Sequence, residues 1–112
     1  MAVPSTQNLT ITRGDTEIVI ITMKDNTNTA VNITGRTYRA QIRTTKDAAA
    51  IAASFVCVIT NAAGGEVTCT LSAGVSATLA AGKYYWDFEE TSSGTVTTIL
   101  AGTVTVLADV SR

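Results

Sequence analysis

The sequence predicts an all-β domain: an antiparallel β-sandwich of about seven strands with one short helical turn. Threonine, valine and isoleucine are frequent, and these residues suit the half-buried surface of a sheet. Short segments alternate apolar and polar residues, and clusters of Gly, Asn, Asp and Ser separate them at the spacing typical of sandwiches. The length of 112 residues fits one domain.

The first expected strand runs from Asn8 to Thr12, with Leu9 and Ile11 on one face. Arg13-Gly14-Asp15 then turns the chain into a second strand, Thr16 to Lys24. That strand is apolar on both faces in its middle, so we expect it to be central or covered on both sides.

A turn is predicted at Asp25 to Asn28, because Asn and Asp side chains bond their own backbone and tolerate left-handed conformations. A short return through Val31 and Ile33 follows. Arg36 to Arg43 shows the cleanest alternation in the chain and predicts a strand with one buried and one solvated face. Its inward residues are Tyr38, Ala40 and Ile42.

A hairpin is expected from Ser54 to Leu71, after an Ala-rich segment, Lys46 to Ala53, that fits a helical turn or a loose connection. A three-residue loop, Ala62-Ala63-Gly64, is a favoured hairpin connection. It sets a register in which apolar residues face apolar residues, and a slip by one residue would mismatch them. The predicted pairs are Asn61 with Gly65, Ile59 with Val67, Cys57 with Cys69, and Phe55 with Leu71.

The short helical turn is placed within Ser72 to Ala81, with Ser72 as N-cap and Gly82 beyond its end, as a link between two sheets. A strand from Lys83 to Glu90 follows, then a turn at Ser92-Ser93-Gly94. Inward Tyr84, Trp86 and Phe88 should form the core with Phe55. The last strand, Val96 to Leu107, directs Leu100, Val104 and Val106 inward and has Gly102 at a bulge or close backbone approach.

Charge and composition narrow the function classes. The net charge is −1 and no Lys/Arg cluster exists, which argues against nucleic acid and membrane surfaces as partners. The first residues lack the pattern of a signal peptide, so synthesis in a cytoplasm is expected. Residues 1–7 show no apolar periodicity and are predicted to be an N-terminal arm that lies on a partner, with residues 8–112 as the single domain.

No catalytic, cofactor-binding or metal-binding residues are predicted, and no enzyme activity is expected. The chain contains no histidine, the commonest general base and metal ligand. Asp87 and Glu89 share one strand face, where a solvated face is the simpler interpretation of a carboxylate pair. Asp25, Asn26 and Asn28 could serve as calcium ligands, but an Asx turn explains them without a metal.

Two further motifs, a cysteine pair and an Arg-Gly-Asp tripeptide, have both a structural and a chemical interpretation. Cys57 and Cys69 are expected opposite each other, either as two small core residues or as a cross-strand disulfide formed in an oxidising medium. Arg13-Gly14-Asp15 spells an adhesion tripeptide, although its role as a turn is sufficient to explain it.

Four stretches taken together resemble a known group: Leu9 to Thr16, Ile33 to Arg43, Leu79 to Glu89, and Leu100 to Val106. Their order is similar to that of small Ig-like structural proteins of tailed bacteriophage virions, including the N-terminal domain of upper baseplate proteins and head-associated proteins. The resemblance implies an Ig-like sandwich that binds other virion proteins without catalysis. Glu17 departs from it, because relatives often have an apolar residue there, so the inward pattern of that strand is expected to begin at Val19.

The resemblance also suggests a place in the particle. The sequence ends at Arg112, soon after the last strand, so we expect a capsid decoration or cement protein that contacts the major capsid protein in many copies. A tail or baseplate component is one alternative. A carbohydrate- or cell-surface-binding module is another, and it would need an exposed aromatic residue, for which Tyr85 is the candidate.

Overall fold

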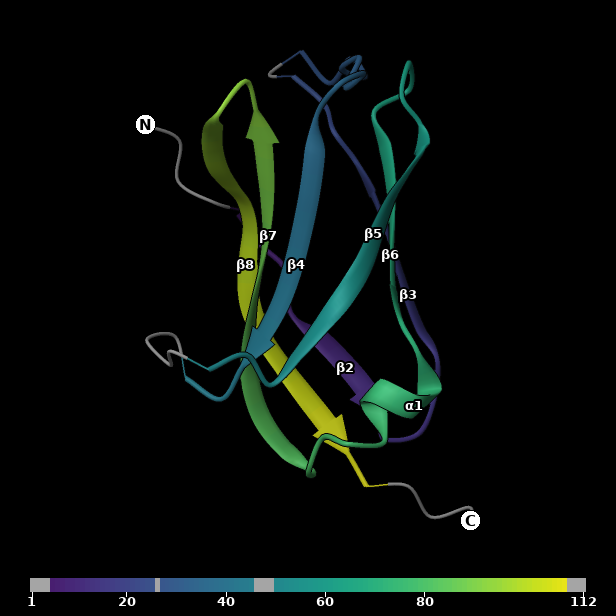
Figure 1. Cartoon of the computed structure of the whole chain (residues 1–112), viewed down its shortest axis with the longest axis vertical. Helices are drawn as coiled ribbons and strands as arrows, with labels where there is room; N and C mark the ends of the chain where they lie inside the picture. Colours follow the sequence, from purple (N-terminus) through teal and green to yellow (C-terminus); the bar gives the residue numbers. More distant parts are fainter. Residues whose placement is uncertain (1–4, 26, 46–49, 109–112) are drawn as a thin grey trace.

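The computed structural model describes residues 5–25, 27–45 and 50–108, and in them the predicted all-β fold with one helical turn is confirmed. Figure 1 shows long strands running along the molecule with a short helix at one end. Four expectations fall partly outside the described residues: the N-terminal arm (residues 1–4), the Asx turn (residue 26), the Ala-rich segment (residues 46–49) and the end of the 8–112 domain (residues 109–112). The elements are β1 Ser5–Thr6, β2 Leu9–Thr12, β3 Glu17–Thr22, β4 Thr37–Arg43, β5 Ala53–Asn61, β6 Glu66–Leu71, α1 Ala73–Ser76, β7 Gly82–Ser92 and β8 Thr95–Leu107.

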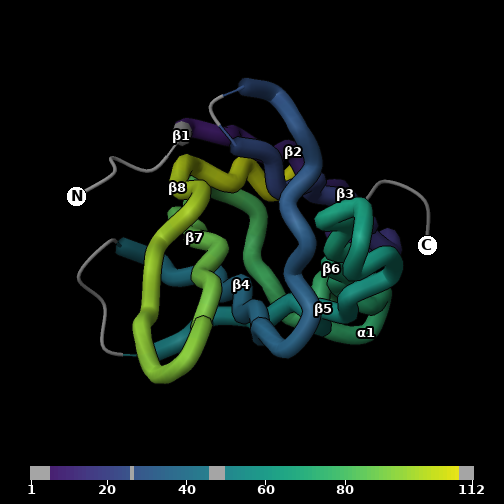
Figure 2. The backbone as a smooth tube through the Cα atoms, turned by 90° about the horizontal axis from the view of Figure 1, so that it is seen from above, coloured from purple at the N-terminus to yellow at the C-terminus, as the bar shows by residue number. Residues whose placement is uncertain are grey.

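The strands form two layers, which Figure 2 shows from above. The first layer, called the aromatic sheet below, has β1 and β2 beside β8, followed by β7, β4 and the start of β5. The second layer, the aliphatic sheet, consists of the rest of β5, then β6 and β3. β5 belongs to both layers, because Ala53–Phe55 pair with β4 whereas the residues from Val56 onward pair with β6.

The sequence predicted antiparallel pairing throughout, but two of the strand pairs are parallel. β1 and β2 run parallel to β8, with Leu9 opposite Val104 and Ile11 opposite Val106. Strands from opposite ends of the chain need no hairpin between them, so sequence neighbours did not fix this direction. Residues 5–7 of the expected arm therefore lie along β8, and Gln7 N–H donates to the Ala101 carbonyl at 3.0 Å.

The expected aromatic core is confirmed. Tyr84, Trp86 and Phe88 project from β7 into the space between the layers and are 8%, 3% and 0% exposed. Phe55 reaches the same space from β5, and its ring centre lies 6.0 Å from that of Trp86. Tyr38 stacks on Phe88 with 5.2 Å between ring centres. This sheet therefore contributes the rings of the core, whose burial dominates the energetics of packing.

The prediction for β3 was wrong. The alternation of Val19 and Ile21 toward the core is present, but β3 lies at the end of the strand order and pairs with β6 alone among the described strands. Ile18 and Ile20 on its other face are 57% and 61% exposed. An apolar outer face indicates that something covers it, but the covering element need not belong to the same chain. Here no described residue covers the outer side of β3.

The β5–β6 hairpin confirms two of the four predicted pairs, Cys57 with Cys69 and Ile59 with Val67. The pairing shifts at a bulge beyond Ile59, so Asn61 faces Glu66 rather than Gly65. The left-handed residue is Gly65, with φ +70°, rather than Gly64. The turn is thus one residue longer than predicted.

The fourth predicted hairpin pair is not formed. Phe55 pairs with Ala40 of β4 instead of with Leu71, because β5 begins in the aromatic sheet and pairs with β6 only from Val56 onward. Alternation within a strand does not reveal where that strand changes its partner.

The helical turn and the last hairpin match their predictions. The hydroxyl of Ser72 accepts from Val75 N–H at 3.3 Å and caps α1, which connects β6 of one layer to β7 of the other. Ser93 and Gly94 form the two-residue turn between β7 and β8 with positive φ at both positions. Gly102 is a close backbone approach, since a Cβ there would collide with the carbonyl of Gln7.

Candidate interaction surfaces

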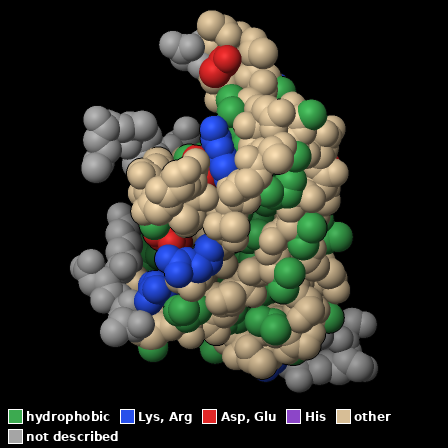
Figure 3. Space-filling view, turned by 45° about the horizontal axis from the view of Figure 1, so that its top comes forward, with side chains coloured by type: hydrophobic (Ala, Val, Ile, Leu, Met, Phe, Trp, Pro, Cys, Tyr) green, Lys and Arg blue, Asp and Glu red, His purple; other side chains and the backbone are tan. Residues whose placement is uncertain are grey.

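The outer side of the aliphatic sheet carries an exposed apolar surface, called the apolar face below. It has two cross-strand rows, Ile18–Thr70–Val56 and Ile20–Thr68–Val58, each running across β3, β6 and β5. Val56 and Val58 are 66% and 53% exposed, much like the two isoleucines. In Figure 3, hydrophobic side chains follow the side of the molecule that carries β5 and β6. None of these six residues is charged.

A charged residue borders the apolar face at the next row. Glu66 lies opposite Thr22 on one side and Asn61 on the other. Thr60 donates to its carboxylate at 2.6 Å and shares a hydrogen bond of 3.1 Å with Thr68. The polar groups at this border are thus bonded to one another. The exposed part of the apolar face consists mainly of isoleucine and valine side chains. Such a contiguous apolar surface with a polar rim is typical of a protein contact site.

The outer side of the aromatic sheet differs in chemistry. Arg39 of β4 faces Glu89 of β7. The Nε and Nη2 groups of the arginine donate to Oε1 of the glutamate at 3.1 and 2.5 Å. Gln41 faces Asp87 in the next row. Partial burial, together with the charge of Glu89, raises the pKa of Asp87. Glu89 is bound to Arg39, so the two acids considered as a possible pair do not form a free carboxylate pair.

A hollow of about 260 Å³ lies on this same side of the molecule. Its polar walls come from Gln41, Arg43 and Asp87, and Tyr85 supplies an aromatic ring. Lys83 lies over that ring with its Nζ 5.5 Å from the ring centre. Tyr85, the candidate for a sugar-stacking residue, is therefore beside a cavity but shares its ring with a lysine.

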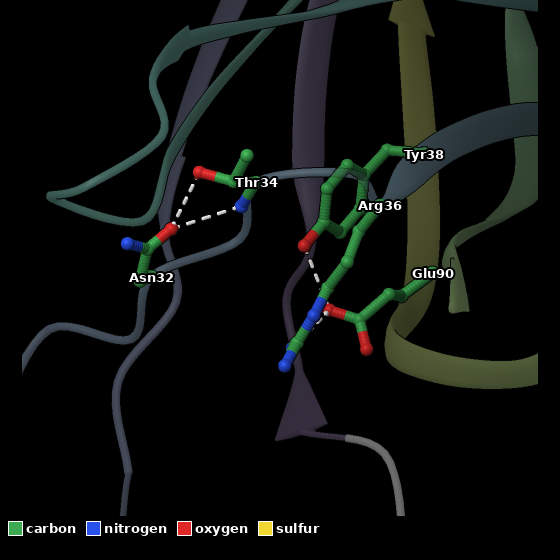
Figure 4. A network of polar contacts seen from close by, with 5 residues as sticks. All are labelled: Asn32, Thr34, Arg36, Tyr38 and Glu90. Atoms are coloured by element: carbon green, nitrogen blue, oxygen red, sulfur yellow. Dashed lines mark hydrogen bonds and ion pairs between the residues drawn. The ribbon is translucent and has the colours of Figure 1, made fainter. Parts of the chain in front are cut away.

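A partly buried polar cluster lies at one end of the sandwich, where the segment before β4 meets the end of β7 (Figure 4). Tyr38 donates to Glu90 Oε2 at 2.7 Å, and Arg36 Nη1 lies 3.3 Å from the same oxygen. Burial, with the hydrogen bond to Glu90, raises the pKa of Tyr38 far above its ordinary value. The phenol therefore stays protonated and acts as a donor, which suits a structural link between strands better than acid–base chemistry.

Next to it, the amide of Asn32 holds its own loop, accepting from the backbone and the hydroxyl of Thr34 at 3.0 and 2.7 Å (Figure 4). The Asx-type bonds fix the entry to β4 and thereby the position of Arg36.

The predicted Asx turn after β3 is confirmed, although Asn26 lies outside the described residues. One oxygen of Asp25 accepts from the backbone and hydroxyl of Thr27, at 2.9 and 2.6 Å, and from Thr29 N–H at 3.1 Å. The Thr27 hydroxyl, followed by these backbone donors, lowers the pKa of Asp25. In the described part of the chain, no group of three or more acidic or cysteine side chains comes together in a way that could hold a metal ion.

Cys57 and Cys69 face each other as the register predicted, with their sulfur atoms 3.2 Å apart as free thiols. The hydrogen bond between them lowers the pKa of Cys57 and, with burial, raises that of Cys69. A disulfide requires a sulfur separation of about 2.05 Å, so the two thiols are hydrogen-bonded neighbours without a covalent bond between them.

The Arg13-Gly14-Asp15 turn is engaged with α1. Buried Ser76 accepts from Gly14 N–H at 3.1 Å and donates to the Asp15 carbonyl at 2.7 Å. The tripeptide therefore fastens the β2–β3 turn to the helix that joins the sheets, which is the structural role that the sequence suggested. As for membranes, the helices described contain no segment long and apolar enough to span a bilayer.

Comparison with known proteins gives a fold likeness. No family model matches the sequence, and no curated protein matches it. Among solved structures, the N-terminal domain of phage TP901-1 ORF48 superposes with a TM-score of 0.55 at 13% identity, over 96% of this chain and 90% of that one. InlP of Listeria monocytogenes superposes with a TM-score of 0.50 at 16% identity, over 90% of this chain but only 26% of InlP. At such identities the likeness shows a shared fold.

Proposed function

We propose that the chain is a non-enzymatic structural protein of a tailed-phage particle, held in place by contacts with other virion proteins. The observation that carries the proposal is the apolar face, an uncharged and exposed surface on the outer side of the aliphatic sheet, which no other described element covers. The fold likeness to a phage domain supports this class of protein.

The chemistry of the remaining polar groups supports a role without catalysis. Glu89 is bound to Arg39, and the Tyr38 phenol is held as a donor to Glu90. A general acid or base needs a titratable group that is free to exchange its proton near a bound substrate. These groups instead join neighbouring strands.

Two positions in the particle fit the apolar face. One is the head, where the protein would decorate and cement the capsid by contact with the major capsid protein. The other is the tail or baseplate, and the phage domain of similar fold gives it about as much support as the head receives. In either position, many copies on a symmetric lattice would bind collectively, so that each single contact needs only modest affinity.

A carbohydrate-binding function is the second candidate, and the hollow beside Tyr85 favours it. An aromatic ring next to Gln41, Arg43 and Asp87 offers both stacking and hydrogen bonding to a sugar. This site lies on the aromatic sheet, whereas the apolar face lies on the aliphatic sheet, so the two functions predict different binding surfaces.

Cosedimentation separates these functions. Purified protein would be mixed with empty capsids, with isolated tails and with an array of bacterial surface glycans. Saturable binding to capsids or to tails supports the structural role and assigns the position in the particle. Binding to glycans with none to either particle fraction would overturn it.

A further inference from the structure

Among the described strands β3 pairs with β6 alone, and its other edge directs backbone groups toward a possible partner. Met23, just beyond β3, donates its N–H to the Gly65 carbonyl at 2.7 Å, toward β6. In an antiparallel pair, alternate residues direct their backbone groups to opposite sides. Counting back from Met23, Val19 and Ile21 therefore bond to β6, whereas Ile18 and Ile20 direct N–H and C=O away from it.

This edge carries few of the features that protect edge strands. Glu17–Thr22 contains no proline and no lysine, and its pairing with β6 is continuous over all six residues without a bulge. Its one charged residue, Glu17, directs a charge inward, but it stands at the first position of the strand, outside the stretch from Ile18 to Ile20. The strand is continuously paired along its inner edge and uncharged on its outer side, and apolar side chains flank it, which favours the addition of another strand.

We propose that two copies of this chain associate through antiparallel pairing of their β3 edges, which joins two three-stranded aliphatic sheets into one six-stranded sheet. Attachment to the particle would use the apolar face, whereas this pairing uses the edge of the same sheet, so either can fail without the other. A two-fold axis is the ordinary symmetry for such a self-complementary contact.

The alternation of side chains restricts the register. Residues that face each other in an antiparallel pair lie on the same side of the sheet, so an exposed residue must face an exposed one. Centring the axis on Val19 places Ile18 opposite Ile20 of the second copy, and Ile20 opposite its Ile18. These pairs exchange four backbone hydrogen bonds, and the four isoleucines form one apolar cluster across the new junction.

The experiment combines sedimentation velocity with residue-resolved amide exchange by NMR over a range of protein concentrations. We expect a monomer–dimer equilibrium in which the amides of Ile18 and Ile20 become protected as the concentration rises. The amides of Val19 and Ile21, which bond β6, should be protected at every concentration. A monomer throughout, or a dimer whose Ile18 and Ile20 amides exchange as freely as before, would overturn the pairing.

Two variants and a control complete the test. Ile20→Pro removes an N–H that faces the free edge, and the loss of two hydrogen bonds should weaken the dimer at least about tenfold. Ile20→Lys is the second variant, for use where the proline prevents folding. It places a charge on the edge of β3 and should also weaken the dimer. Val58→Lys lies in the same row but two strands from the edge, so dimerisation should persist while particle binding is lost. Equal effects of Ile20→Lys and Val58→Lys on dimerisation would contradict the edge pairing.

Discussion

The two sheets share one core but show different chemistry to the outside. The aromatic sheet buries Tyr84, Trp86 and Phe88 and covers its outer side with charges such as the Arg39–Glu89 pair. The aliphatic sheet buries smaller side chains, and its outer side carries the uncharged apolar face with Glu66 at its border. The outer side of the aromatic sheet has the charged composition of a surface that faces water, whereas the apolar face of the aliphatic sheet has the composition of a protein interface. The aromatic sheet supplies the largest buried side chains, and the proposed function gives the aliphatic sheet the role in association.

Truncation to alanine should separate the two layers most strongly. Phe88 is fully buried and stacked on Tyr38, so Phe88→Ala should lower the free energy of unfolding by about 3–5 kcal/mol. Val56 is 66% exposed, and Val56→Ala should cost less than about 1 kcal/mol. Urea unfolding at low protein concentration measures both. Similar costs for the two variants would show that the outer row is covered within the monomer.

A smaller effect is expected where the N-terminal segment joins the aromatic sheet. Gly102→Ala would drive a methyl group against the carbonyl of Gln7, with Asn8 Oδ1 only 2.8 Å away. Such overpacking should cost about 1–3 kcal/mol and loosen the pairing of β1 with β8. Thermal unfolding with amide exchange of residues 5–7 is the measurement.

Gly74→Ala is the matched control, because a Cβ at Gly74 in α1 meets nothing within 4 Å. Alanine in a helix should leave stability unchanged or raise it by about 0.5–1 kcal/mol. A Gly102→Ala variant as stable as the Gly74→Ala variant would contradict the close approach of the two backbones.

The weakest expected effect concerns pH and the charged side of the aromatic sheet. Burial raises the pKa of Asp87, so the folded state binds that proton more tightly than the unfolded chain does. The resulting stabilisation is fully present below the unfolded pKa and is lost as pH rises through the folded pKa. Asp87→Asn should therefore gain stability over the parent as pH rises from about 3 to about 7, where the parent carries the ionised carboxylate.

Asp25→Asn should show the opposite sign. Hydrogen bonds from Thr27 and Thr29 lower the pKa of Asp25, so its contribution is present above the unfolded pKa and is lost as pH falls. Unfolding curves of both variants and the parent across this range would test the pair. Parallel pH profiles for Asp87→Asn and Asp25→Asn would refute the assigned environments.

The sequence predicted the aromatic sheet better than the aliphatic one, and the reason is physical. β7 alternates large rings with polar residues, and this pattern specifies which side is buried whatever the partner strand is. β3 is apolar on both sides, which is equally compatible with a central strand and with an edge strand that associates with another molecule. Periodicity reports which side chains avoid water, but not whether this chain or a partner provides the cover.

The same limit explains the surfaces that were missed. Val56 and Val58 alternate with the inward residues of β5, so their side chains point outward although valine is apolar. Their outward position, together with that of Ile18 and Ile20, was a signal in the sequence that the register of β3 against β6 brings into one surface. The hollow beside Tyr85 could not be foreseen, because it depends on the pairing of β4 with β7 and β7 with β8.

The most direct test of the central claim is the binding of a Val56→Lys/Val58→Lys variant to capsids and tails. Both positions point away from the core, so the variant should keep the unfolding free energy of the parent to within about 1 kcal/mol and remain a folded domain. The account predicts that this protein no longer cosediments with either particle fraction. Undiminished binding by the charged variant would contradict it.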